Sequence, residues 1–157
     1  LARCPDVNLE IFGSGGYASV RDLRRALAPL AGRVRFWGQQ RDVATIYRSI
    51  DYLLTGLPEK EALGLNVIEA QACGTPVLAP NAPPFIETVV DGATGFFYRD
   101  PRTDDGADFG RLIERLTVLP ARPDPQQAAA HLERFSFAAF VARIAPVVDW
   151  ARRECGA

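Results

Sequence analysis

The fold of this chain is decided by the stretch EALGLNVIEAQACGTPV, residues 61–77. Its apolar and small residues between Gly64 and Gly74 predict a largely buried helix over residues 65–73, because glycine commonly marks the ends of a helix. A short apolar strand over residues 76–79 follows at once. A buried helix that leads directly into an apolar strand is typical of an α/β protein, so this stretch predicts that fold class.

The same alternation of strand and helix extends outward in both directions. The predicted strands cover residues 7–12, 34–37, 51–55, 76–79 and 95–98. The predicted helices cover residues 17–27, 42–49, 65–73, 83–90 and 109–119. Strands that alternate with helices form parallel sheets, so the sequence predicts a Rossmann-like parallel sheet with helices on both faces. Ligands bind such sheets at the loops beyond the carboxyl ends of the strands.

We interpret residues 1–157 as one domain, with a core over about residues 5–120. The polar residues 102–108 are predicted to form a loop. Two further helices are predicted over residues 126–134 and 137–153, where Pro146 is expected to kink or split the second.

Composition excludes several classes of protein. With 48% hydrophobic residues, 24% charged residues and a net charge of -1, the chain is typical of a soluble domain and not of a nucleic-acid binder. No apolar run reaches the length of a membrane helix, and we expect a cytoplasmic protein. The three cysteines form no C-x-x-C pair, which argues for reduced thiols and against zinc. Because the chain contains no methionine, we expect residue 1 not to be the native start, and the chain to be either an excised piece or a processed product.

Two glutamates bracket the start of the central predicted helix. Glu61 lies in the loop before it, and Glu69 lies about one turn inside it. Gly64 between them lets a ligand approach the backbone closely. The free N–H groups at the helix start can bind a diphosphate, and a carboxylate one turn further can accept hydrogen bonds from ribose hydroxyls. Eight residues span about 12 Å along a helix, which suits the reach of a nucleotide-sugar across its diphosphate.

Residues 61–77 resemble the E-x7-E signature of the retaining glycosyltransferases of family 4, or group 1, with its trailing E-A-x-A-x-G-x-P-V. Similar segments occur on both sides of the signature. They are the strand ending in G-x-G at 11–15, V-x-F-x-G at 34–38, the strand at 51–54, E-x-V-x-D-G-x-T-G at 87–95, and F-S-F at 135–137. The resemblance implies the C-terminal, donor-binding half of a GT-B fold, truncated at its N-terminus.

The resemblance also implies a reaction and roles for named residues. Glu61 would contact hydroxyls of the transferred sugar and support positive charge at the anomeric carbon. Glu69 would bind the ribose, and the N–H groups of Gly64, Leu65 and Asn66 would bind the diphosphate or the sugar. The implied enzyme moves a hexose from a UDP-, GDP- or ADP-sugar with retention, without a metal ion or a cofactor. Fixed donors would stabilise the leaving diphosphate.

Two glycine turns complete the implied donor site. Trp37 and Gly38 end one predicted strand and would lie against the nucleotide base. Gly13 ends the first predicted strand and would face the ligand cleft. The acceptor site, and any peripheral contact with a membrane, would belong to an N-terminal domain that this chain lacks. We therefore expect the isolated chain to be inactive, as part of an enzyme of polysaccharide or glycolipid biosynthesis.

The chain departs from the family pattern in two respects. The resemblance implies a strand and helix that carry an arginine and a lysine for the diphosphate, and we expect them to precede residue 1. Pro83 and Pro84 stand where the family often has two glycines, which weakens the case for a role of this loop near the sugar. Arg41 and Lys60 lie near predicted ligand loops, but we assign both to the solvated surface.

Other functions stay open at this point. A nucleotide-binding module without turnover, or a GT-B-like epimerase or phosphorylase, would share the same segment. A dinucleotide site is disfavoured, because the G-x-G-x-x-A run at 13–18 lacks the acidic residue expected about 20 residues later. Asp104, Asp105 and Asp108 lack a metal-binding spacing, and His131 has no nucleophile near it in sequence.

Overall fold

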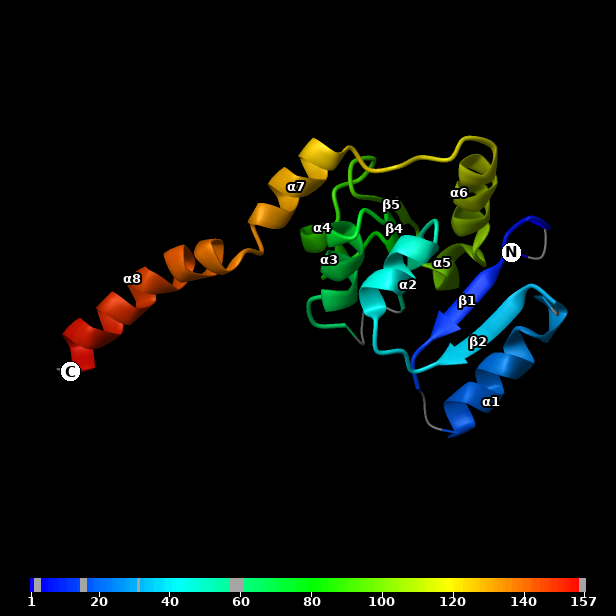
Figure 1. Ribbon diagram of the computed structural model, residues 1–157, viewed down its shortest axis with the longest axis horizontal. Helices are drawn as coiled ribbons and strands as arrows, with labels where there is room; N and C mark the ends of the chain where they lie inside the picture. The colour runs from blue at the N-terminus through cyan, green and yellow to red at the C-terminus, as the bar shows by residue number, and fades with distance from the viewer. Residues whose placement is uncertain (2–3, 15–16, 31, 57–60, 156–157) are drawn as a thin grey trace.

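The computed structural model describes residues 1, 4–14, 17–30, 32–56 and 61–155. Within these residues, short parallel strands form two sheets (Figure 1). The strands are β1 (Leu9–Phe12), β2 (Val34–Gly38), β3 (Leu53–Leu54), β4 (Val77–Pro80) and β5 (Gly95–Tyr98). β1 pairs with β2 in one sheet, and β4 lies between β3 and β5 in the other.

A helix follows every strand, as the sequence predicted. The helices are α1 (Tyr17–Ala26), η1 (Ala28–Leu30), α2 (Val43–Ser49), α3 (Leu65–Ala72), α4 (Phe85–Thr88), α5 (Pro101–Asp104), α6 (Ala107–Val118), α7 (Pro125–Glu133) and α8 (Phe137–Cys155). Several begin at an aspartate whose carboxylate accepts hydrogen bonds from backbone N–H groups of the first turn: Asp42 for α2, Asp100 for α5 and Asp124 for α7.

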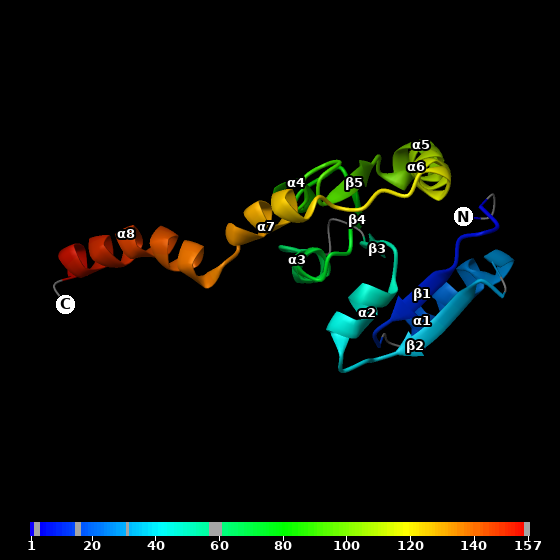
Figure 2. The ribbon, with the colours of Figure 1, turned by 45° about the horizontal axis from the view of Figure 1, so that its top comes forward.

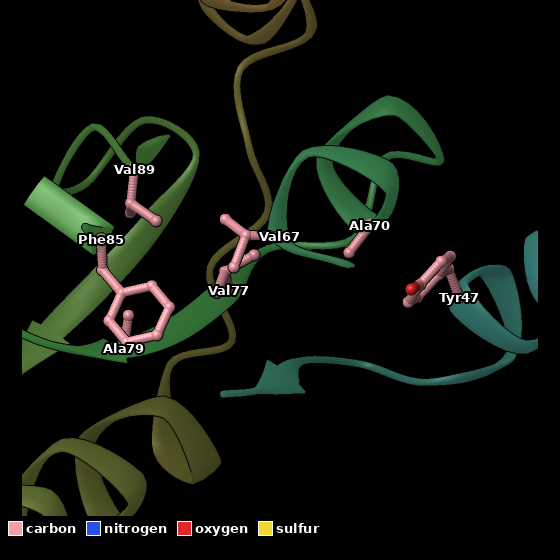
Figure 3. Close-up of a cluster of buried hydrophobic side chains, with 7 residues drawn as sticks. All are labelled: Tyr47, Val67, Ala70, Val77, Ala79, Phe85 and Val89. Carbon is pink, nitrogen blue, oxygen red and sulfur yellow. The ribbon is translucent and has the colours of Figure 1, made fainter. Parts of the chain in front are cut away.

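The core lies on both faces of β4, whose four residues are all buried. Successive side chains of a strand point to opposite faces. On one face Val77 and Ala79 pack with side chains of α2, α3 and α4, which Figure 3 shows as a single cluster. On the other face Leu78 packs with side chains of α6 and with Cys4. Helices therefore cover both faces of this sheet, and the predicted fold class is confirmed.

The division into two sheets was not anticipated. The sequence predicted one sheet, but β1 and β3 do not pair in the structure. The strand predicted over residues 51–55 is also shorter and less buried than expected. Only Leu53 and Leu54 form it, and Leu54 is 39% exposed. Among the described residues β3 pairs with β4 alone, which limits the hydrogen bonds that hold it in the sheet.

The loop predicted over residues 102–108 is wrong, because this segment is mostly helical. α5 and the start of α6 lie within it. Asp100 caps α5 and Pro101 occupies its first position, which is a favoured way to begin a helix. The polar side chains are used at the helix ends, where Asp104 accepts hydrogen bonds from the N–H groups of Gly106 and Asp108.

The C-terminal helices leave the compact part of the chain. α7 packs against α3, whereas α8 extends away from both sheets in two views (Figures 1 and 2). Pro146 lies inside α8, which continues on both sides of it and is not split. Phe137 and Trp150 of α8 are among its exposed apolar residues. No helix within the described ranges is both long and apolar enough to cross a bilayer, and a cytoplasmic location stays a prediction.

Candidate functional site

The start of α3 presents backbone donors for which the described residues supply no acceptor. Gly64 caps the helix in the left-handed conformation, with φ of 78°. The first intrahelical hydrogen bonds run from the N–H groups of Val67 and Ile68 to the Gly64 oxygen. The N–H groups of Leu65 and Asn66 therefore have no acceptor within the helix, as expected for its first turn. Both point along the axis at the end where the helix dipole is positive.

Glu61 folds back onto the same loop. Its Oε1 atom accepts hydrogen bonds from the N–H of Gly64 at 2.9 Å and from the N–H of Ala62 at 3.1 Å. The Gly64 N–H, predicted as a donor to the diphosphate or the sugar, is thus already bonded to a carboxylate. The donors that remain at this helix start are those of Leu65 and Asn66. Position 64 leaves little room for a side chain, because a Cβ there would lie 3.2 Å from Val67 Cγ2.

Glu69 lies exposed on α3 and has a buried partner. The hydroxyl of Tyr47 on α2 donates a hydrogen bond to Glu69 Oε2 at 3.0 Å. Tyr47 is only 9% exposed. Burial, followed by the contact with the Glu69 carboxylate, raises the pKa of Tyr47 to about 12, so the hydroxyl stays protonated and acts as a donor. Tyr47 carries no signal of a site in the sequence, because its spacing with Val43 and Ile46 is that of an ordinary core residue.

Gly13, Trp37 and Gly38 come together at the ends of β1 and β2. The Gly13 N–H donates to the Gly38 oxygen at 2.8 Å, and both glycines have positive φ. The Trp37 ring stacks on Phe12 with centroids 6.2 Å apart, and its indole N–H donates to the Glu10 carboxylate. Trp37 is still 49% exposed, which leaves ring surface accessible.

The predicted residues thus form two groups. One contains Gly13, Trp37 and Gly38, and the other consists of residues 61–69 around the start of α3. Within the part of the chain that the structure describes, no hydrogen bond or ring contact joins the two groups. A cavity of about 850 Å³ lies between the sheets, lined by β1, α2, β3 and α6, and Asn66 is the predicted site residue that borders it.

The remaining polar candidates have structural partners or no site around them. Asp108 accepts hydrogen bonds from Arg99 and Arg111, and no three His, Cys, Asp or Glu side chains cluster among the residues described. His131 is buried, with Nε2 2.9 Å from the Thr88 oxygen. Arg41 is exposed, and Lys60 lies outside the described residues.

Comparison with known proteins agrees with this architecture. Residues 1–132 match the family described as Glycosyl transferases group 1. The D-inositol 3-phosphate glycosyltransferase of Rhodococcus erythropolis is 33% identical over 150 residues, which cover 87% of this chain and 33% of that protein. The enzyme of the same name from Mycobacterium tuberculosis H37Ra is 34% identical over 145 residues, which cover 87% of this chain and 30% of that protein. The chain therefore spans about a third of the length of these curated relatives.

Solved structures show the same fold. Anabaena HepE in complex with UDP superposes with a TM-score of 0.79 and 23% identity, over 94% of this chain and 42% of that one. HepE in complex with UDP-glucose gives a TM-score of 0.76 and 25% identity. Sucrose-phosphate synthase from Thermosynechococcus elongatus superposes with a TM-score of 0.78 and 25% identity, over 95% of this chain and 39% of that one. The fold is that of the GT-B glycosyltransferases, and this chain belongs to the group 1 glycosyltransferase family.

Proposed function

We propose that this chain is the donor-binding part of a retaining glycosyltransferase that uses a nucleoside diphosphate sugar and needs no metal ion. The observation that carries the proposal is the arrangement at the start of α3. Two N–H groups without intrahelical acceptors, those of Leu65 and Asn66, lie between the carboxylates of Glu61 and Glu69 along the chain.

The diphosphate binds at the N–H groups of Leu65 and Asn66. The positive end of the α3 dipole favours an anion there, and fixed donors stabilise the charge that develops on the leaving diphosphate. Glu69 lies one turn further along the helix and binds the ribose. An ionised carboxylate only accepts hydrogen bonds, which matches the hydroxyl donors of a ribose.

Glu61 acts on the transferred sugar. Its carboxylate lies before the helix, held against the N–H groups of Ala62 and Gly64. A carboxylate fixed in this way can accept from sugar hydroxyls and stabilise positive charge at the anomeric carbon. Retention of configuration is part of the same proposal and is tested by the anomeric form of the product.

The group at Gly13, Trp37 and Gly38 holds the nucleotide base. The exposed part of the Trp37 ring offers a flat surface for it. Among the possible donors, a UDP-hexose is favoured, because HepE was solved with UDP and with UDP-glucose. The acceptor is then bound by a part of the enzyme outside this chain, since the chain spans about a third of the length of its curated relatives.

Isothermal titration calorimetry with UDP, GDP and ADP tests the proposal. The chain should bind UDP more tightly than GDP or ADP, and EDTA should leave the affinity for UDP unchanged. Glu69→Ala should weaken binding about 10- to 100-fold, the usual effect of losing a hydrogen bond to a charged group. Glu114→Ala, an exposed glutamate on α6, is the matched control and should bind like the wild type. No binding to any nucleotide, or equal binding by Glu69→Ala, would contradict the proposal.

Turnover is expected only from the complete enzyme. Sugar transfer by the isolated chain, measured with UDP-glucose and D-inositol 3-phosphate, would show that these residues contain an acceptor site and would overturn that part of the proposal.

A further inference from the structure

The exposed carboxylate of Glu69 is tied to a buried hydroxyl on another helix. A glutamate on a helix surface ordinarily samples several rotamers, and fixing one of them costs side-chain entropy. Here the Tyr47 hydroxyl, 22 positions earlier in the sequence, donates to Glu69 Oε2 at 3.0 Å. The contact therefore selects one orientation of the carboxylate before any ligand is present.

Tyr47 is itself fixed at several points. Figure 3 shows its ring entering the core cluster from α2, on the side of Ala70. The Thr75 hydroxyl donates to the Tyr47 carbonyl oxygen at 2.5 Å, which ties the end of α2 to the turn before β4. Asp42 caps the other end of α2 by accepting from the N–H of Thr45. A hydroxyl held in this way provides a rigid reference point for Glu69.

The hydroxyl leaves most of the carboxylate available. It occupies one acceptor position on Oε2, whereas an ionised carboxylate has two oxygens and about four such positions. The raised pKa of Tyr47, about 12, keeps the proton on the hydroxyl at every physiological pH. Tyr47 therefore donates to Glu69 without competing for the hydrogen-bond donors of a ligand.

We propose that Tyr47 is a positioning residue for nucleotide binding: its hydroxyl holds the Glu69 carboxylate in the orientation that accepts the ribose hydroxyls. This inference rests on the proposed function, in which Glu69 binds the ribose. Preorganisation of this kind raises affinity because the carboxylate loses less freedom when the ligand binds.

The test is calorimetry with UDP on Tyr47→Phe, which removes one oxygen atom and keeps the ring in the core. We expect UDP affinity to fall about 3- to 10-fold, the range for one lost hydrogen bond. Tyr52→Phe is the matched control. It removes a hydroxyl that donates to the Ala121 oxygen and accepts from the Ala121 N–H, away from Glu69. Its affinity for UDP should equal that of the wild type.

A double-variant comparison separates positioning from general stability. If Tyr47 acts through Glu69, Tyr47→Phe should have no further effect on UDP affinity in the Glu69→Ala background. An equal loss in both backgrounds would show that Tyr47 acts by another route and would overturn the inference. So would wild-type affinity in Tyr47→Phe when Glu69→Ala binds weakly, a result that leaves the proposed function intact. If the wild type binds no nucleotide, the proposed function fails, and the positioning role fails with it.

A second measurement needs no variant at position 47. The Tyr47 hydroxyl proton, protected by its hydrogen bond, should give an observable proton resonance in wild-type protein that is absent in Glu69→Ala. The resonance should persist when UDP is added. Its loss on addition of UDP would mean that Tyr47 leaves Glu69 in the complex, which contradicts the inference.

Discussion

Gly95 lies so close to Val77 that a Cβ at position 95 would clash with the Val77 carbonyl oxygen. The two residues are partners in the register of β4 and β5, and both are buried. Val89 Cγ1 would lie 2.9 Å from the same Cβ. Gly95 is therefore required by the packing of the sheet that carries α3.

Gly95→Ala should destabilise the chain by about 2 kcal/mol or more, since the added methyl group forces backbone apart in a close-packed region. The change is measured by urea unfolding followed by circular dichroism. Gly110→Ala is the control, because a Cβ at this position in α6 would meet no described atom within 4 Å apart from its chain neighbours and the nearby backbone of its own helix. Replacing a helical glycine by alanine there should stabilise by up to about 1 kcal/mol. Similar stability of Gly95→Ala and the wild type would show that β5 can shift without cost.

His131→Ala should lower stability by about 2 kcal/mol. His131 Nε2 lies 2.9 Å from the Thr88 oxygen, and because a carbonyl only accepts, the hydrogen-bonded tautomer carries its proton on Nε2. Truncation removes this bond and leaves a cavity between α7 and its neighbours. Gln126→Ala, exposed on the same helix, should change stability by less than about 0.5 kcal/mol. Equal thermal midpoints for the two variants would argue against a structural role for His131.

Stability should fall at alkaline pH, in part through Tyr98. Burial, with a smaller contribution from the charge of Asp100, raises the pKa of Tyr98 from 10.0 to about 12. A group whose pKa is higher in the folded state stabilises fully below its unfolded value, so this contribution is complete below pH 10 and is lost between pH 10 and 12. Tyr98→Phe should show a shallower loss of thermal midpoint over this range. Tyr47, whose pKa is also raised, remains in the variant and keeps some slope. Identical slopes in both proteins would refute the assignment.

Glu61→Gln in the complete enzyme should reduce turnover about 100- to 1000-fold while nucleotide affinity changes little. Glutamine keeps an oxygen that can accept from the N–H groups of Ala62 and Gly64, so the loop should hold its shape. It lacks the charge proposed to act at the anomeric carbon. Glu114→Gln on α6 serves as the control for loss of one negative charge. Equal losses of kcat and UDP affinity would contradict the division of roles between Glu61 and Glu69.

The helices and strands were predicted most accurately where the local sequence pattern and the packing favour the same element. α3 begins and ends as expected because Gly64 and Gly74 adopt positive φ at its two ends, a backbone conformation that other residues rarely adopt. β4 was recognisable because all of its residues are apolar and buried. The polar residues 102–108 were misread as a loop, since the signal for a helix lies just before them, in Asp100 and Pro101.

Only the local contacts of the candidate site were predictable from the sequence. Glu61 and Gly64 are close in sequence, and their contact follows from one short loop. The contact between Tyr47 and Glu69 depends on how α2 packs against α3, which no local pattern specifies. The short β3 has a similar cause, because the length of a strand is set by neighbours that are distant in sequence.

The separation of the two sheets has a consequence for the rates at which backbone amides exchange with solvent. β4 is hydrogen-bonded on both sides and buried throughout, whereas β1 has one neighbour and no fully buried residue. Deuterium uptake should therefore be slowest in β4 and faster in β1 and β2, because exchange requires local opening. A diphosphate at the start of α3 and a base at Trp37 would slow uptake in different peptides. One exchange experiment with and without UDP would thus test separately the proposed diphosphate site at α3 and the proposed base site at Trp37.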